Sequence, residues 1–90
     1  MKSLEECRIE IDRIDREMLR LFEERMDVAK DVAIYKKAHN LELFHPERER
    51  EVIAKCKDYV KNPRYKKYVE EYMNRLMDID RKSTRLNSSH

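Results

Sequence analysis

The sequence predicts an all-α protein: three helices per chain, the first of them long, assembled as an intertwined helical homodimer. The 90 residues include no glycine and 44% of them are charged, which favours helices with solvated outer faces over sheets with tight turns. Apolar residues recur every three or four positions from Leu4 to Val32 with no proline between them, as in one long amphipathic helix. A chain of this length forms one small domain with a thin core.

The first helix is predicted to run from about Ser3 to about His39. Ser3 suits the N-cap because Glu6 follows three residues later, and Asn40 can end the helix. About 35 residues at 1.5 Å each give a helix of about 50 Å, longer than any globule that this chain can build around it. We therefore expect a second copy of the chain to cover part of the helix.

A coiled coil is the alternative account of the long helix. It is disfavoured because Arg8, Asp15 and Arg25 fall in or near the seam that a heptad pattern would bury. The intertwined dimer stays the preferred prediction.

A short loop, residues 41–45, is expected to turn Leu43 and Phe44 inward before the second helix. Pro46 suits the first turn of that helix, and Asn62 and Pro63 end it. Its inward face is predicted to carry Val52, Ile53, Cys56 and Val60.

The third helix is predicted to begin near Arg64. Its inward stripe contains three tyrosines, for which core packing is the preferred interpretation; the members are Tyr65, Tyr68, Val69, Tyr72, Leu76 and Ile79. Continuing this stripe by one turn reaches Asp80, and by another turn Thr84.

The composition changes after Lys82. Residues 83–90 are polar, rich in serine and without a helical pattern of apolar residues, and they resemble translated vector or sequencing-adapter sequence. We therefore predict a helical domain over residues 1–82 and a tail foreign to it over 83–90.

Several classes of function are disfavoured by composition. A formal net charge of +2 is too small to indicate a nucleic-acid partner, and no apolar run is long enough for a membrane span, so we expect a cytoplasmic protein. His39, His45 and His90 are scattered, and Cys7 and Cys56 are not in a CxxC pair. We expect no metal and no cofactor.

Two cations lie where apolar residues are expected. Arg25 and Lys36 project to within roughly 20° of the middle of the apolar stripe, three turns apart, and Arg8 lies near its edge. Such cations must be paired or must bind an anion, so together they could hold a small molecule with two negative ends. Alternatively, Arg25 pairs with an inward carboxylate such as Glu49 while Lys36 extends to solvent. Spacing alone leaves both interpretations open.

Four segments of the chain together resemble the all-helical chorismate mutases. They are the Ile-Asp pair followed by a Leu-rich turn and an Arg at 14–26, the continuation to Lys36, the Arg-Glu step at 46–49, and the stretch 76–82. Their order and spacing match over about residues 4 to 82.

This resemblance implies an intertwined homodimer that converts chorismate to prephenate, a step of phenylalanine and tyrosine biosynthesis, by a pericyclic rearrangement without a cofactor. It implies that Arg25 and Arg48 hold the substrate carboxylates and that Lys36 donates to the ether oxygen. It also implies that Glu49 binds the ring hydroxyl and that Arg8 reaches into the site of the other protomer.

Three positions depart from the family pattern. His45 stands where Asp is common, at a contact made largely by the main chain, and Asp80 stands where a small hydroxyl residue is frequent. Thr84 stands where the family has the Gln or Glu that hydrogen-bonds the ether oxygen, and threonine is too short for that contact. The sequence therefore predicts a folded dimer with weakened activity.

Three other interpretations remain. An isochorismate pyruvate lyase would use the same cations on an isomeric dianion. A non-catalytic helical dimerisation or ligand-binding module would pair its cations internally and bind no dicarboxylate. The chain could also be a mutase domain detached from a larger aromatic-biosynthesis protein, as the family is often fused.

Overall fold

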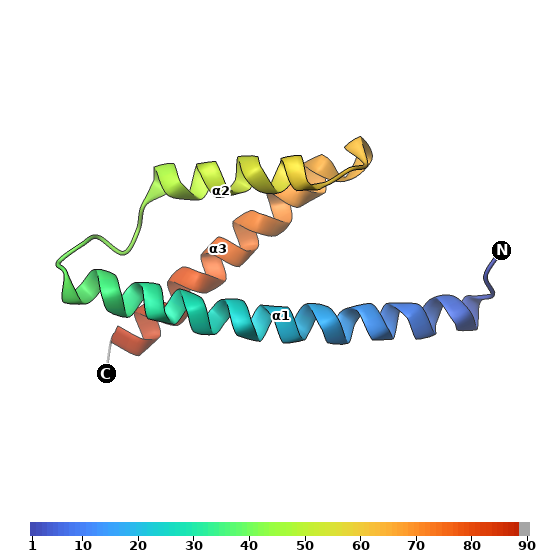
Figure 1. The fold of residues 1–90 in the computed structure, drawn as a ribbon, viewed down its shortest axis with the longest axis horizontal. Coiled ribbons are helices and arrows are strands. Elements are labelled where there is room, and N and C mark those ends of the chain that lie inside the picture. Colours follow the sequence, from blue (N-terminus) through green and yellow to red (C-terminus); the bar gives the residue numbers. More distant parts are fainter. Residues whose placement is uncertain (89–90) are drawn as a thin grey trace.

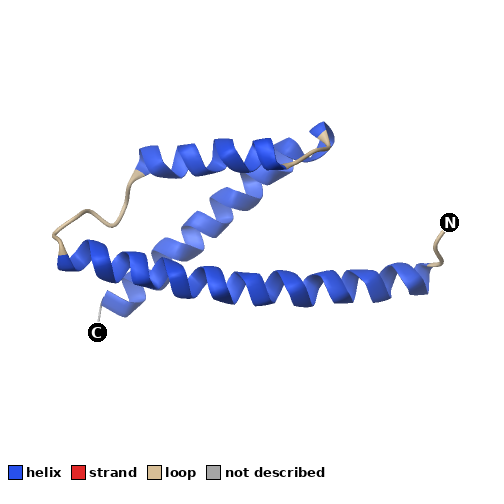
Figure 2. Ribbon diagram, viewed as in Figure 1, coloured by secondary structure: helices blue, strands red, loops and turns tan. Residues whose placement is uncertain are grey.

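The computed structural model consists of three α-helices and one short 3₁₀ turn (Figure 1). It describes residues 1–88, with side chains as far as Thr84. The helices are α1 (Leu4–Ala38), α2 (Pro46–Tyr59) and α3 (Lys66–Ser88), and the turn is η1 (Pro63–Tyr65). Residues 1–88 contain no strand (Figure 2), which confirms the all-α prediction.

Both ends of α1 follow the sequence signals. The Ser3 hydroxyl accepts a hydrogen bond from the Glu6 N–H at 3.1 Å, and Glu5 and Glu6 place negative charge at the positive end of the helix. Asn40 adopts a left-handed backbone with φ 56°, a conformation that asparagine tolerates and that stops the helix. The predicted limits of this helix are confirmed.

The second and third helices differ slightly from the prediction. α2 begins at Pro46 as expected, but it ends at Tyr59, a few residues before Asn62. Asn62 instead caps the 3₁₀ turn, because its side-chain oxygen accepts a hydrogen bond from the Arg64 N–H at 3.0 Å. α3 then begins at Lys66.

α3 continues to Ser88, well past Lys82, so the lack of helical pattern in the predicted tail does not end the helix. The Thr84 hydroxyl lies 3.1 Å from the carbonyl oxygens of Asp80 and Arg81, so its hydrogen-bonding capacity is met within its own helix. The foreign origin of residues 83–90 stays a prediction, and residues 89 and 90 lie outside the described part of the chain.

The core is small and centred on α3. Three side chains of α3 are buried, and partly buried apolar residues from α1, α2 and α3 itself pack against them; the buried set is Met73, Leu76 and Met77, and the flanking set is Phe22, Val52, Ile53, Cys56 and Val69. α2 and α3 pack as a hairpin, and α3 crosses the C-terminal half of α1 (Figure 1).

The tyrosine stripe is not part of this core. Tyr65, Tyr68 and Tyr72 are each more than half exposed, so the prediction that they pack in the core is wrong within one chain. α3 is rotated so that its methionines face inward instead. Leu43 and Phe44 of the loop also remain nearly half exposed.

The N-terminal half of α1 extends beyond the other helices (Figure 1), and every residue from 11 to 20 is exposed, including several large apolar ones. The accessible surface is 8029 Å², whereas a compact monomer of this mass exposes about 5,700 Å². The radius of gyration is 16.4 Å, against about 12 Å for a compact chain of this length. A single chain therefore leaves far more surface uncovered than a monomeric domain does. No helix within residues 1–88 combines the length and the apolar character needed to cross a membrane.

Candidate functional site

A cavity of about 250 Å³ lies where the three helices approach one another. Its walls come from the C-terminal half of α1, the first turns of α2, the end of α3 and Leu43 of the connecting loop. Four cations and two carboxylates contribute to the lining, which leaves a formal excess of two positive charges; they are Arg25, Lys36, Arg48, Arg81, Glu49 and Asp80. Apolar side chains of all three helices, Leu43 of the loop and the Thr84 side chain complete it.

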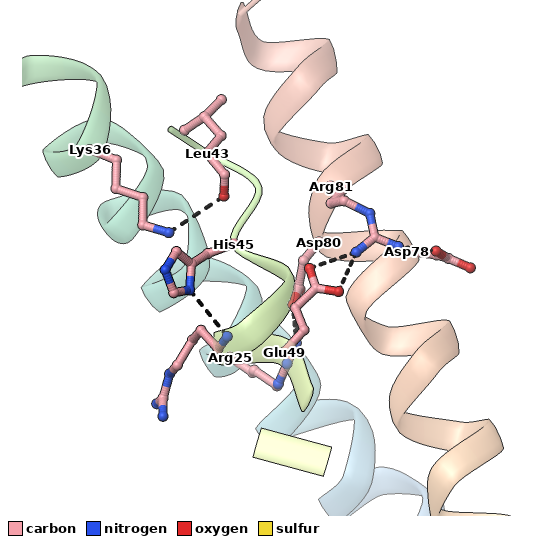
Figure 3. Close-up of polar contacts among 9 residues, drawn as sticks. Arg25, Lys36, Leu43, His45, Glu49, Asp78, Asp80 and Arg81 are labelled. Carbon is pink, nitrogen blue, oxygen red and sulfur yellow. Dashed lines mark hydrogen bonds and ion pairs between the residues drawn. The ribbon is translucent and has the colours of Figure 1, made fainter. Parts of the chain in front are cut away.

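Arg25 projects from α1 onto α3 and pairs with Asp80 (Figure 3). One terminal nitrogen, Nη1, donates to both carboxylate oxygens of Asp80 at 2.8 Å, and both side chains are largely buried. Arg25 is therefore paired with an inward carboxylate, as the alternative prediction has it, but that carboxylate is Asp80 and not Glu49. The Nη2 and Nε groups of Arg25 have no hydrogen-bond partner among the described side chains, so one edge of the guanidinium remains available.

Glu49 pairs instead with Arg81. Nη1 of Arg81 donates to the two Glu49 oxygens at 2.5 and 2.6 Å, which ties the first turn of α2 to the end of α3 (Figure 3). Arg81 also donates through Nη2 to Asp78 and lies 5.0 Å from the centroid of the Phe44 ring. The hydrogen bonds that Arg81 donates to Glu49 raise the pKa of Arg81 more than any other contact does, so this guanidinium is charged at every accessible pH.

Lys36 and Arg48 are the least committed cations of the cavity. Lys36 Nζ donates to the Leu43 carbonyl oxygen across a long 3.4 Å and forms no ion pair within the described part of the chain. Arg48 lies 3.7 Å from Glu51 in an exposed pair one turn away on α2, a type of contact that contributes little. Both cations can turn toward an anion at small cost.

Six of the eight predicted site residues line the cavity: Arg25, Lys36, Arg48, Glu49, Asp80 and Thr84. The other two, Arg8 and His45, do not. The His45 ring caps α2, since its Nδ1 accepts a hydrogen bond from the Arg48 N–H at 3.1 Å. Arg8 is exposed and lies about 25 Å from Arg25 along α1, so it cannot reach the cavity of its own chain.

Arg81 is the cavity residue that sequence reasoning did not single out. The feature of the sequence that could have identified it is its position four residues after the buried Met77, which places both residues on the same face of α3. A cation beside Asp80 was not distinguishable from a solvated surface residue until the rotation of α3 was known.

The arrangement suits binding and orientation of an anion. Its polar groups are cations, two carboxylates and one hydroxyl, and both carboxylates are already paired with arginines. The described side chains include no group of three His, Cys, Asp or Glu residues placed to hold a metal ion.

Comparison with known proteins identifies a family for the chain. A family model described as chorismate mutase type II matches residues 7–84, a span that contains all six of the predicted residues in the cavity. The bifunctional chorismate mutase/prephenate dehydratase of Aquifex aeolicus (strain VF5) is 51% identical over 55 residues, which are 61% of this chain and 15% of that protein. The T-protein of Haemophilus influenzae (strain ATCC 51907 / DSM 11121 / KW20 / Rd) is 41% identical over 49 residues, which are 54% of this chain and 13% of that protein.

The matched part of the chain thus spans less than a sixth of the length of these two relatives. No solved structure matches the chain significantly. The family match reaches two residues beyond the predicted domain limit at residue 82 and includes Thr84. Because it covers most of the sequence, the chain belongs to the chorismate mutase type II family.

Proposed function

We propose that this chain converts chorismate to prephenate by a pericyclic [3,3] rearrangement, a step in the biosynthesis of phenylalanine and tyrosine. The observation that carries the proposal is the charge of the cavity: its formal excess of two positive charges matches a substrate with two carboxylates. Membership of the type II family and the names of the two relatives support the same reaction.

The substrate is held by those parts of the cationic side chains that make no strong ion pair among the described residues. Arg25 offers its unpaired guanidinium edge to one carboxylate, and Arg48 leaves its weak pair with Glu51 to bind the other. A flexible dianion fixed at both ends is kept in the compact conformer that reacts, which is catalysis by positioning. A pericyclic step needs no nucleophile, general base or metal, so a cavity of this kind is sufficient for it.

Lys36 supplies the interaction that distinguishes transition state from ground state. Its ammonium leaves the 3.4 Å contact with the Leu43 carbonyl and donates to the ether oxygen, which gains negative charge as its bond breaks. The interaction is therefore stronger in the transition state than with the neutral ether, as rate acceleration requires. Glu49 accepts a hydrogen bond from the ring hydroxyl.

The same proposal includes a homodimer. Each chain exposes about 2,300 Å² more than a compact monomer would, and the largest obligate interfaces bury an area of about this order on each partner. The exposed half of α1 carries the apolar residues that such an interface needs, and it also carries Arg8. Arg8 would complete the cavity of the partner.

Sedimentation equilibrium is expected to give a mass twice the 11.1 kDa of the chain. Its physical reason is the uncovered apolar face of α1, which would be costly to leave in water. A compact monomer at micromolar concentration would contradict both the dimer and the role of Arg8 in the other protomer's site.

The reaction is tested by following the ultraviolet absorbance of chorismate with the parent chain and with Arg25→Ala. We expect the variant to raise KM and to lower kcat/KM by about tenfold to a hundredfold, because it removes charge-assisted hydrogen bonds to a carboxylate. Arg20→Ala is the matched control: Arg20 lies on the same helix, is exposed, and among the described side chains pairs with Glu17 and Glu24, which lie outside the cavity.

Equal loss in both variants would mean that Arg25 acts through helix stability and not through the substrate. Isochorismate is assayed in parallel. Release of pyruvate from isochorismate, with chorismate unchanged, would replace the proposed mutase reaction with the lyase reaction.

A further inference from the structure

We propose that Arg81 is a positioning residue: it holds the Glu49 carboxylate toward the substrate hydroxyl and keeps it from pairing with Lys36 and Arg25. This inference rests on the proposed function, because it assigns a task to Glu49 in the same cavity. It concerns a side chain that the predicted site did not include.

Arg81 is fixed from three sides, by residues of three different segments. Phe44 of the loop faces the guanidinium at 5.0 Å, Asp78 accepts from Nη2, and Glu49 of α2 accepts from Nη1 through both oxygens. Only 31% of its side-chain surface is exposed. A cation held in this way provides a rigid support for the carboxylate beside it.

The same contacts argue against a direct role of Arg81 with the substrate. Both of its terminal nitrogens already donate to carboxylates. Among the described side chains, by contrast, Nη2 of Arg25 has no partner and Arg48 has one exposed pair at 3.7 Å. Arg81 therefore acts through Glu49, and the other two arginines are the groups that face the ligand.

Glu49 needs such a support because cations surround it. Lys36, Arg25 and Arg48 line the same cavity, and Lys36 has only a weak carbonyl contact to lose. Without Arg81, the Glu49 carboxylate would gain most by pairing with one of these cations. That pairing would remove a hydrogen-bond acceptor from the substrate hydroxyl and a cation from the substrate oxygens at once.

A double-mutant cycle between Arg81→Met and Glu49→Gln tests this inference. In the parent, Arg81→Met is expected to lower kcat/KM for chorismate about tenfold to a hundredfold, the effect of losing a charge-assisted hydrogen bond. In the Glu49→Gln background the same change is expected to cost less than about twofold, because the group it positions is already neutral. Arg81→Lys should fall between parent and Arg81→Met, since it keeps the charge but loses the fork.

The matched control is Arg75→Met, which removes the same charge from an exposed position on α3 outside the cavity. It is expected to leave kcat/KM unchanged. Thermal unfolding followed by circular dichroism identifies variants that lose structure. If Arg81→Met does not fold, Arg81→Lys takes its place in the cycle, and its effect on kcat/KM is again expected to be smaller in the Glu49→Gln background than in the parent.

The cycle is also measured on the affinity for prephenate by calorimetric titration. Equal effects of Arg81→Met in both backgrounds, on turnover and on affinity, would overturn the positioning role. Coupling seen in prephenate affinity, with no chorismate turnover in the parent, would uphold it and overturn the proposed reaction. A parent chain that neither binds prephenate nor converts chorismate would overturn both.

Discussion

Replacing Thr84 with glutamine is expected to raise kcat for chorismate about 10²- to 10³-fold, the usual effect of one hydrogen-bond donor aimed at an oxygen that gains charge. Thr84 lines the cavity at the end of α3 within the matched family segment, and the resemblance described above implies a Gln or Glu at this place. Its hydroxyl lies 3.1 Å from the carbonyl oxygens of Asp80 and Arg81, and its single proton is directed to its own helix. A glutamine amide is long enough to extend past that backbone into the cavity.

Ser83→Gln is the matched control for this gain. It places the same side chain one residue away, at a position that does not line the cavity, so it is expected to leave kcat unchanged. Initial rates of chorismate disappearance compare the three chains at saturating substrate. A Thr84→Gln variant no faster than the parent would contradict the idea that this position limits the rate.

Changing Lys36 to alanine is expected to lower kcat about 10²- to 10³-fold while KM changes much less. Lys36 has no ion pair within the described residues and makes only the long contact with the Leu43 carbonyl, so its removal costs little structure. In the proposed mechanism its charge acts mainly on the transition state, which is why kcat should carry the loss.

Lys37→Ala provides the comparison. Lys37 is the next residue on α1, it is exposed, and it is absent from the cavity lining. Its removal should leave kcat near the parent value, and thermal unfolding of both variants should match the parent. A similar fall in kcat for the two variants would show that positive charge near the end of α1, rather than Lys36 itself, supports the reaction.

Local signals in the sequence predict the limits of the elements well. The Ser3 cap, the Asn40 stop and Pro46 at the start of α2 act through hydrogen bonds and backbone angles of their immediate neighbours, so no tertiary information is needed. The convergence of Arg25 and Lys36 follows from helical periodicity in the same way, since both lie on one face of one helix.

The ion pairs between helices could not be predicted from the sequence as well as the limits of the helices. An inward carboxylate was one expected partner of Arg25, with Glu49 as the example, but the rotation of α3 brings Asp80 to Arg25 and Arg81 to Glu49. That rotation is set by Met73 and Met77 filling the core, a packing choice that apolar periodicity does not separate from the tyrosine stripe beside it. The exposed fractions of these tyrosines are those of one chain taken by itself.

The pair between Arg25 and Asp80 means that the cavity contains its own counter-ion for this guanidinium. A dianion that enters does not meet a bare guanidinium; it joins, or partly replaces, a carboxylate already held by two contacts of 2.8 Å. Substrate binding therefore exchanges an internal anion for an external one. The free energy needed to weaken the pair between Arg25 and Asp80 reduces the net free energy of binding. With a small hydroxyl residue at position 80, Arg25 would have no internal carboxylate there and would pair with the substrate alone. Asp80 therefore lowers the affinity for the substrate but fixes the position of the Arg25 guanidinium before the substrate binds.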